Sequence, residues 1–203
     1  MCKFVKIKNY KYISMKRMIM MTLVIFTAVG SLLAQPRKTM EKILFYGVDF
    51  TNTKICLATE SEDEFREAFL KINSLLLEEQ GKYDLGRALK ADVAIDISAI
   101  WKLTEDADLS KMKITSTNYP EPDHAAIVKA YELAETEGTG IVFIAELLNK
   151  PAAEGTYTVV KFDIESREIL ESRKVSTMAG GFGLRNYWAN TVYKTIKAMK
   201  TGF

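Results

Sequence analysis

The chain has 203 residues, 48% of them hydrophobic, with 28 Lys and Arg against 26 Asp and Glu. Six of the basic residues and none of the acidic ones lie within residues 1–34, so the remainder carries 22 basic and 26 acidic residues, a net charge of −4. This mildly acidic balance gives no electrostatic reason to expect nucleic acid or anionic lipid as a partner.

The first predicted element is a secretory signal peptide over residues 1–34. A short basic cap at residues 15–17 precedes an uncharged apolar run at 18–33, and Ala34 is followed by polar Gln35. These three features are typical of exported proteins, and the run is shorter than the ~20 residues that span a bilayer, which would be the alternative. We therefore expect cleavage near Ala34/Gln35, no stable membrane span afterwards, and a periplasmic or extracellular location.

Two points concern the limits of the mature chain. Residues 1–14 carry four lysines and no acid, so either they extend the basic part of the signal or translation starts at Met15. Residues 35–203 have the length of one domain, and we expect a single α/β domain there. Cys56 is its only cysteine and stands between apolar residues, which predicts a buried small side chain and no internal disulfide.

The first half of the predicted domain contains two strands and a helix. Residues 43–50 form an apolar and aromatic run that predicts a buried strand, and residues 53–58 either extend it past a turn at 51–52 or form a further short strand. Ser61 and Glu64 form a capping-box pattern before apolar residues at helical spacing, which predicts a helix that ends at Gly81. Residues 92–100 alternate between apolar and polar, which predicts a strand with one wet face. Residues 102–122 read as a long loop, with a short strand at 112–117 as an alternative.

The second half contains a helix, three successive strands and a last helix. The helix starts near residue 122 and stops at 138, the strands cover 141–148, 157–163 and 168–177, and the last helix covers 184–199. This order predicts an α+β two-layer sandwich, with a mixed or mostly antiparallel sheet of about five strands and about three helices. Strict strand–helix alternation is absent, which disfavours a doubly wound nucleotide-binding fold.

A glycine-rich junction between the last strand and the last helix is one candidate contact site. Its residues that carry chemistry are Gly181, Gly183, Arg185, Asn186 and Tyr187. Glycines let the backbone approach a ligand, and a helix N-terminus offers free N–H groups to an anion. The alternative is a conformational break in which Asn186 caps the helix.

The other candidate site is the face of the 92–100 strand, which carries Asp92, Asp96 and Trp101. Four residues of strand separate the two carboxylates by ~13 Å, too far for a shared catalytic pair. They either line one edge of a site or hydrate an exposed face, and Trp101 would line a groove beside them.

The sequence lacks the patterns of the common catalytic and metal sites. His124 is the only histidine and is expected to be solvated in the first turn of a helix, so no histidine-rich metal site is expected. No G-x-S-x-G motif occurs. We expect no metal, no cofactor and no catalytic residue of these types.

The C-terminal 60 residues resemble a family. The stretches Ile-Val-Phe-Ile-Ala-Glu at 141–146, Tyr-Thr-Val-Val-Lys-Phe-Asp-Ile-Glu-Ser-Arg-Glu-Ile-Leu at 157–170 and Gly-Gly-Phe-Gly-Leu-Arg-Asn-Tyr-Trp-Ala at 180–189 are similar to small exported Gram-negative proteins. The order of strand, hairpin and helix is similar to the α/β domain of the curli-secretion (CsgG-like) and TolB N-terminal type. The chain lacks a lipidation cysteine at the cleavage region, so pore formation is not carried over. The resemblance implies a scaffold for assembly or binding.

Two functions follow as hypotheses. The first is an exported, non-catalytic binding or assembly protein whose partner is an envelope protein or a small ligand. The alternative is an envelope-acting hydrolase that uses Asp92 or Asp96 near Arg185. Self-association into a homo-oligomer is compatible with the first.

Overall fold

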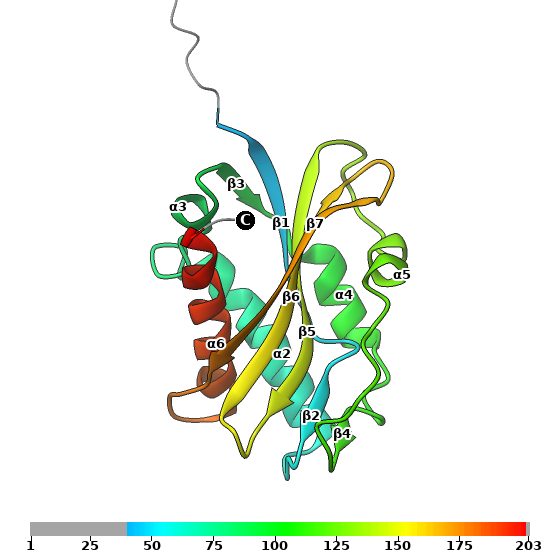
Figure 1. Ribbon diagram of the computed structural model, residues 1–203, viewed down its shortest axis with the longest axis vertical. Helices are drawn as coiled ribbons and strands as arrows, with labels where there is room; N and C mark the ends of the chain where they lie inside the picture. The colour runs from blue at the N-terminus through cyan, green and yellow to red at the C-terminus, as the bar shows by residue number, and fades with distance from the viewer. Residues whose placement is uncertain (1–39, 202–203) are drawn as a thin grey trace, which may run out of the picture. The chain divides into compact units, whose positions relative to one another are not determined.

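The computed structural model describes residues 40–201 (Figure 1). The signal peptide, its cleavage point and the choice of start codon therefore lie outside the described residues. The strands and helices, in chain order, are β1 (Lys42–Asp49), β2 (Lys54–Cys56), α2 (Glu62–Glu78), α3 (Leu85–Leu89), β3 (Asp92–Ile95), α4 (Ser98–Asp106), β4 (Lys113–Ile114), α5 (His124–Lys129), β5 (Thr139–Asn149), β6 (Glu154–Asp163), β7 (Ile169–Met178) and α6 (Leu184–Ala198), followed by a 3-10 turn at Met199–Thr201. None of the helices in this part of the chain is both long and apolar enough to cross a membrane.

All seven strands belong to one sheet, and its central strands are parallel. β1 lies between β3 and β5 and runs parallel to both, while β2 pairs in parallel with the end of β5 and with β4. Only the β5–β6 and β6–β7 pairs are antiparallel. The fold is α/β, with five α-helices in the described part. The prediction of an α+β sandwich with about five mostly antiparallel strands and about three helices is therefore wrong.

Part of the error in the number of helices arises at residues 92–100, where the predicted strand stops after Ile95. The side chain of Asp96 accepts a hydrogen bond from the backbone N–H of Ser98 at 2.9 Å, which turns the chain into α4. Ile97, Ile100 and Trp101 are three and four residues apart and fit a helix as well as a strand. β3 was therefore predicted too long, and α4 was missed.

Helices cover both faces of the sheet and enclose two apolar cores (Figure 1). On one face, α2, α3 and α6 bury the larger core against the sheet; its aromatic members include Phe45, Phe65, Phe69, Phe143, Tyr157 and Trp188. On the other face, α4 contributes Ile100 and α5 contributes Val128 to a smaller core. Cys56 is 3% exposed, which confirms the prediction of a buried small side chain.

A bulge in β1 sets which side chains face which core. Gly47 has a φ of +94°, and the register of β1 against β5 shifts between Phe45 and Val48. The buried Asn73 of α2 accepts a hydrogen bond from Val48 N–H at 2.8 Å and donates one to Val48 C=O at 2.9 Å. This side chain therefore satisfies backbone groups that the bulge removes from the ladder and fixes α2 on the sheet.

Several local predictions are confirmed. Ser61 and Glu64 form the expected capping box of α2, and α6 runs over nearly the expected residues. In the turn between β6 and β7, Asp163 accepts a hydrogen bond from the backbone N–H of Ser166. Trp188 of α6 is 1% exposed and belongs to the larger core.

Candidate functional site

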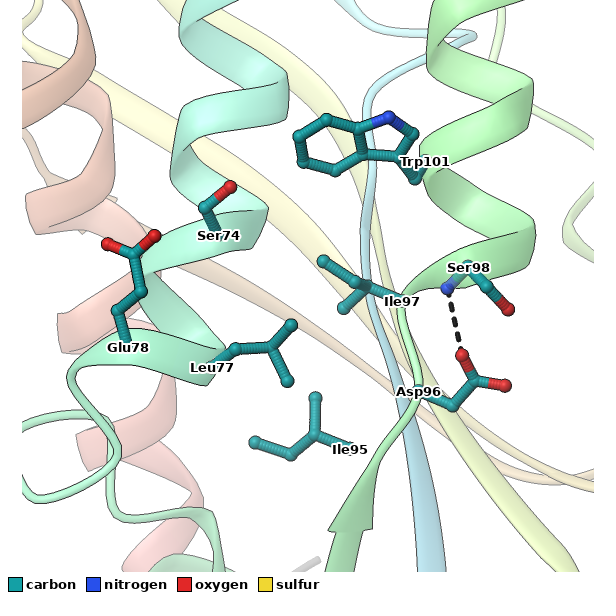
Figure 2. A pocket seen from close by; sticks show the side chains of 8 residues that line it. All are labelled: Ser74, Leu77, Glu78, Ile95, Asp96, Ile97, Ser98 and Trp101. Atoms are coloured by element: carbon teal, nitrogen blue, oxygen red, sulfur yellow. Dashed lines mark hydrogen bonds between the residues drawn. The ribbon is translucent and has the colours of Figure 1, made fainter.

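A groove between α2 and α4 brings two of the predicted site residues together. It has a volume of about 590 Å³ and is lined by Ser74, Leu77, Glu78, Ile95, Asp96, Ile97, Ser98 and Trp101. Figure 2 shows Leu77, Ile95 and Ile97 in the middle of the groove, and the indole of Trp101 reaching from α4 towards α2. We refer to this hollow as the α2–α4 groove.

The groove exists because β3 is short and α4 continues the chain beyond it. The guanidinium of Arg66 on α2 fixes the end of α4, since it donates hydrogen bonds to the backbone carbonyls of Thr104, Glu105 and Ala107 at 2.7, 2.8 and 2.9 Å. These carbonyls are among those that a helix end leaves without a partner. The two helices are therefore held together at one end, while the groove lies nearer the start of α4.

The chemistry of the groove is apolar at the centre and acidic at its two sides. Glu78 stands on the α2 side and Asp96 on the α4 side, and their carboxylates do not point toward one another (Figure 2). Leu77, an apolar residue of the lining, is 42% exposed. This arrangement suits contact with an apolar group better than acid–base chemistry, because no two functional groups converge on one point.

The structure brings together two of the three residues predicted on the 92–100 face. Asp96 and Trp101 both line the groove, although Trp101 lies in α4 and not at the end of a strand. Asp92 is exposed at the opposite end of β3, beside Lys42 of β1. It takes no part in the groove.

The glycine-rich junction forms a second, smaller hollow at the start of α6. Its volume is about 220 Å³, and it is lined by Glu60, Lys150, Gly183, Leu184, Tyr187 and Trp188. Gly181 has a φ of +110°, and a Cβ there would meet the carbonyl oxygen of Asn186 at 3.2 Å, so this position requires glycine. Phe182 is 95% exposed beside it.

The remaining predicted residues of the junction have other roles. Gly183 is the N-cap of α6 and the helix has no side-chain cap, so the alternative in which Asn186 caps it is wrong. The side chain of Asn186 instead accepts hydrogen bonds from Arg185 at 2.9 and 3.0 Å. Arg185 lines neither hollow, while Tyr187 lines the smaller one.

An ion pair forms the polar wall of this smaller hollow. Lys150 Nζ lies 2.5 Å from Glu60 Oε1. Burial acts to raise the pKa of Glu60, but the hydrogen bond from Lys150 and its charge bring that pKa below its ordinary value. The pair is therefore internally satisfied and offers few free groups to a ligand.

A buried carboxylate on the other face of the sheet was not predicted. Glu146 lies in β5 with 0% exposure, at a second register shift between Ala145 and Leu147. It accepts hydrogen bonds from Thr158 Oγ1 at 2.5 Å and Tyr119 OH at 3.1 Å, and it pairs with Lys174 Nζ at 2.8 Å.

The only histidine also belongs to this cluster. His124 Nε2 lies 3.0 Å from Glu146 Oε1, and the side chain of His124 is only 17% exposed, so the prediction of a solvated histidine is wrong. A sequence signal was present in Glu146 itself, an acidic residue inside the apolar run 141–148. Such a residue must find partners when the strand is buried.

Electrostatics explain how this carboxylate remains inside the protein. Burial acts to raise the pKa of Glu146, but hydrogen bonds from Lys174 and Thr158 and the charge of Lys174 outweigh it and lower that pKa. Burial and the nearby carboxylate raise the pKa of Tyr119 to about 12. Each member of the cluster that contacts Glu146 is paired with it, so the cluster holds residues 119–124 against the sheet. Among residues 40–201, no group of three or more His, Cys, Asp or Glu side chains is placed to hold a metal ion.

Fold and groove together define a small α/β domain with an apolar groove beside β3, at the edge of its sheet. No protein-family model and no curated protein matches the sequence. Among solved structures, the chain is similar to the C-terminal domain of LpoB from Salmonella enterica, with 12% sequence identity and a TM-score of 0.31. The match covers 74% of this chain and 92% of that one. At this level the likeness carries no argument about the site.

Proposed function

We propose that the protein is an exported, non-catalytic interaction protein that binds part of an envelope protein in the α2–α4 groove. The observation that carries the proposal is the groove itself, whose apolar lining includes Leu77, which is 42% exposed, and Trp101, which is partly exposed. Exposed apolar surface of this kind marks interaction sites in soluble domains. Export follows from the signal-peptide pattern of residues 1–34.

The hydrolase alternative finds no support in the arrangement of its residues. It needs Asp92 or Asp96 to approach a second carboxylate or Arg185. Asp92 lies outside the groove, and Asp96 lines a groove that Arg185 does not line.

A photocrosslinking amino acid in place of Leu77 tests the proposal in the cells that make the protein. We expect a crosslinked envelope protein that disappears when Trp101→Ala is added, because that change removes one wall of the groove. The matched control places the same amino acid at Leu170, which is 57% exposed on β7, away from the groove. Equal adducts at both positions, or none that depend on Trp101, would contradict the proposal. The intact mass of the recovered protein tests export, with cleavage expected before Gln35.

A further inference from the structure

The α2–α4 groove is acidic and contains no compensating cation. Two of its eight lining residues are acidic, Glu78 and Asp96, and none is basic. The basic side chains of the flanking elements are engaged elsewhere, in pairs with other acids or with backbone carbonyls. These are Lys71 with Glu67, Lys82 with Glu79, Lys102 with Glu132, and Arg66 with the end of α4. A bound group therefore meets uncompensated negative charge on both sides of the groove.

Both carboxylates have free oxygens. The side chain of Glu78 makes no hydrogen bond or ion pair with the other residues of 40–201. Asp96 uses Oδ1 to accept from Ser98 N–H, which leaves Oδ2 without a partner in the same part of the chain. Each carboxylate can thus accept a hydrogen bond from a cationic donor without losing an internal contact.

Trp101 adds a second feature that favours a cation. Its indole reaches across one end of the groove, above Ile97 (Figure 2). Tryptophan is the aromatic side chain that attracts ammonium and guanidinium groups most strongly. The apolar centre of the groove accepts methylene groups, so a side chain with an apolar stem and a charged end matches both parts.

Resting on the function proposed above, we propose that the groove takes a cationic amphipathic segment of the partner protein. Apolar side chains of the segment lie on Leu77, Ile95 and Ile97, and a Lys or Arg side chain lies beside Trp101 and reaches Glu78 or Asp96. A volume of about 590 Å³ is enough for a few side chains and not for a whole folded element. The occupant is therefore a short stretch of chain.

Short synthetic peptides titrated into the purified protein test this proposal. Three peptides share the same leucines and differ at two positions, which carry lysine, glutamine or glutamate. The readout is the indole N–H resonance of Trp101 in a nitrogen-15 spectrum. Trp188 is buried and serves as the internal control, because its indole resonance should not move. We expect the lysine peptide to bind most tightly. The affinity of the glutamate peptide should be lower by a factor of about ten or more.

Variants of the two carboxylates complete the test. Glu78→Gln and Asp96→Asn should each lower the affinity for the lysine peptide about two- to fivefold. The affinity for the glutamine peptide should stay unchanged. The asparagine side chain still accepts from Ser98 N–H, so α4 keeps its start. Glu62→Gln, at the far end of α2, is the matched control and should change nothing.

The outcomes separate this proposal from the one on which it rests. If no peptide moves the Trp101 resonance, the groove is not a binding site and both fail. If the glutamine and lysine peptides bind equally, the groove binds apolar chain and only the cationic specificity is overturned. Binding of the lysine peptide that is insensitive to salt would also overturn it, because surface charge attraction is screened at high ionic strength.

Discussion

Removal of the buried carboxylate in β5 should destabilise the protein strongly. Glu146→Ala leaves the hydroxyls of Thr158 and Tyr119 without their acceptor, and Lys174 without its buried partner. A buried polar group that loses its partner costs about 1–3 kcal/mol. Lys174 is 46% exposed and can turn to water, so we assign it no cost. The two hydroxyls then give a loss of about 3 kcal/mol in the free energy of unfolding, measured by urea denaturation at pH 7.

The pH dependence gives a second test of this cluster. Because the pKa of Glu146 is lowered in the folded protein, its charge stabilises the fold above the ordinary carboxyl range. That contribution is lost as the pH falls through the lowered pKa. The difference in stability between the native protein and Glu146→Gln should therefore be largest near neutral pH and shrink below about pH 4.5.

An exposed glutamate provides the control for this prediction. Glu171→Ala on β7 should change the unfolding free energy by no more than about 0.5 kcal/mol. The role assigned to Glu146 is refuted if Glu146→Ala costs no more than this control. It is also refuted if the difference between the native protein and Glu146→Gln grows as the pH falls.

Two further substitutions test the bulge and the glycine-rich junction. Gly47→Ala should cost about 3 kcal/mol by urea denaturation, because the new Cβ would lie 2.5 Å from Asn73 Oδ1 at a φ of +94°. Gly81→Ala, which has open space around it, should be close to neutral, and equal losses would contradict this account. Phe182→Ser should leave the melting temperature within about 1 °C, since the ring is 95% exposed, and a larger drop would mean that the ring packs against the fold.

Local patterns made the long elements predictable. The capping box and the apolar spacing of α2 lie within one continuous stretch, and the β5–β6–β7 hairpins follow one another along the chain. Such elements depend on contacts close in sequence, which propensity and periodicity describe well. The same patterns do not reveal the parallel pairing of β1 with β5, because 95 or 96 residues separate the paired positions, such as Ile43 from Thr139 and Val48 from Phe143.

The short strands, the groove and the buried polar cluster were harder to predict from the sequence. β2 and β4 contain three and two residues, too few for a clear period, so the strands at 53–58 and 112–117 that contain them could be offered only as alternatives. Asp96 and Trp101 were placed on one strand face, and they do share a groove, but only because the chain changes from strand to helix between them. His124 looked solvated because its partner Glu146 lies on a strand that follows later in the chain.

The position of the groove follows from what fills the usual ligand site of such sheets. In parallel α/β sheets, ligands bind beyond the carboxyl ends of the strands, where the connections diverge to opposite faces. Here the connection from β1 to β3 passes through α2, which lies on one face of the sheet. The connection from β3 to β5 passes through α4 and α5, which contribute to the core on the other face. The two connections therefore diverge between the neighbouring strands β1 and β5.

The chain itself closes that crevice. After β1 ends, Thr53 donates its hydroxyl to Ala145 C=O at 2.9 Å, and β2 pairs with the last residues of β5 (Figure 1). The carboxyl end of β3 has no such filling, because β3 stops at Ile95 and the chain leaves the sheet as α4. The α2–α4 groove therefore lies beyond the carboxyl end of β3, at the edge of the sheet. This is one strand away from the position between β1 and β5 where such sheets usually bind a ligand. An edge groove of this kind is open along its length, which suits a segment of another protein better than an enclosed small molecule.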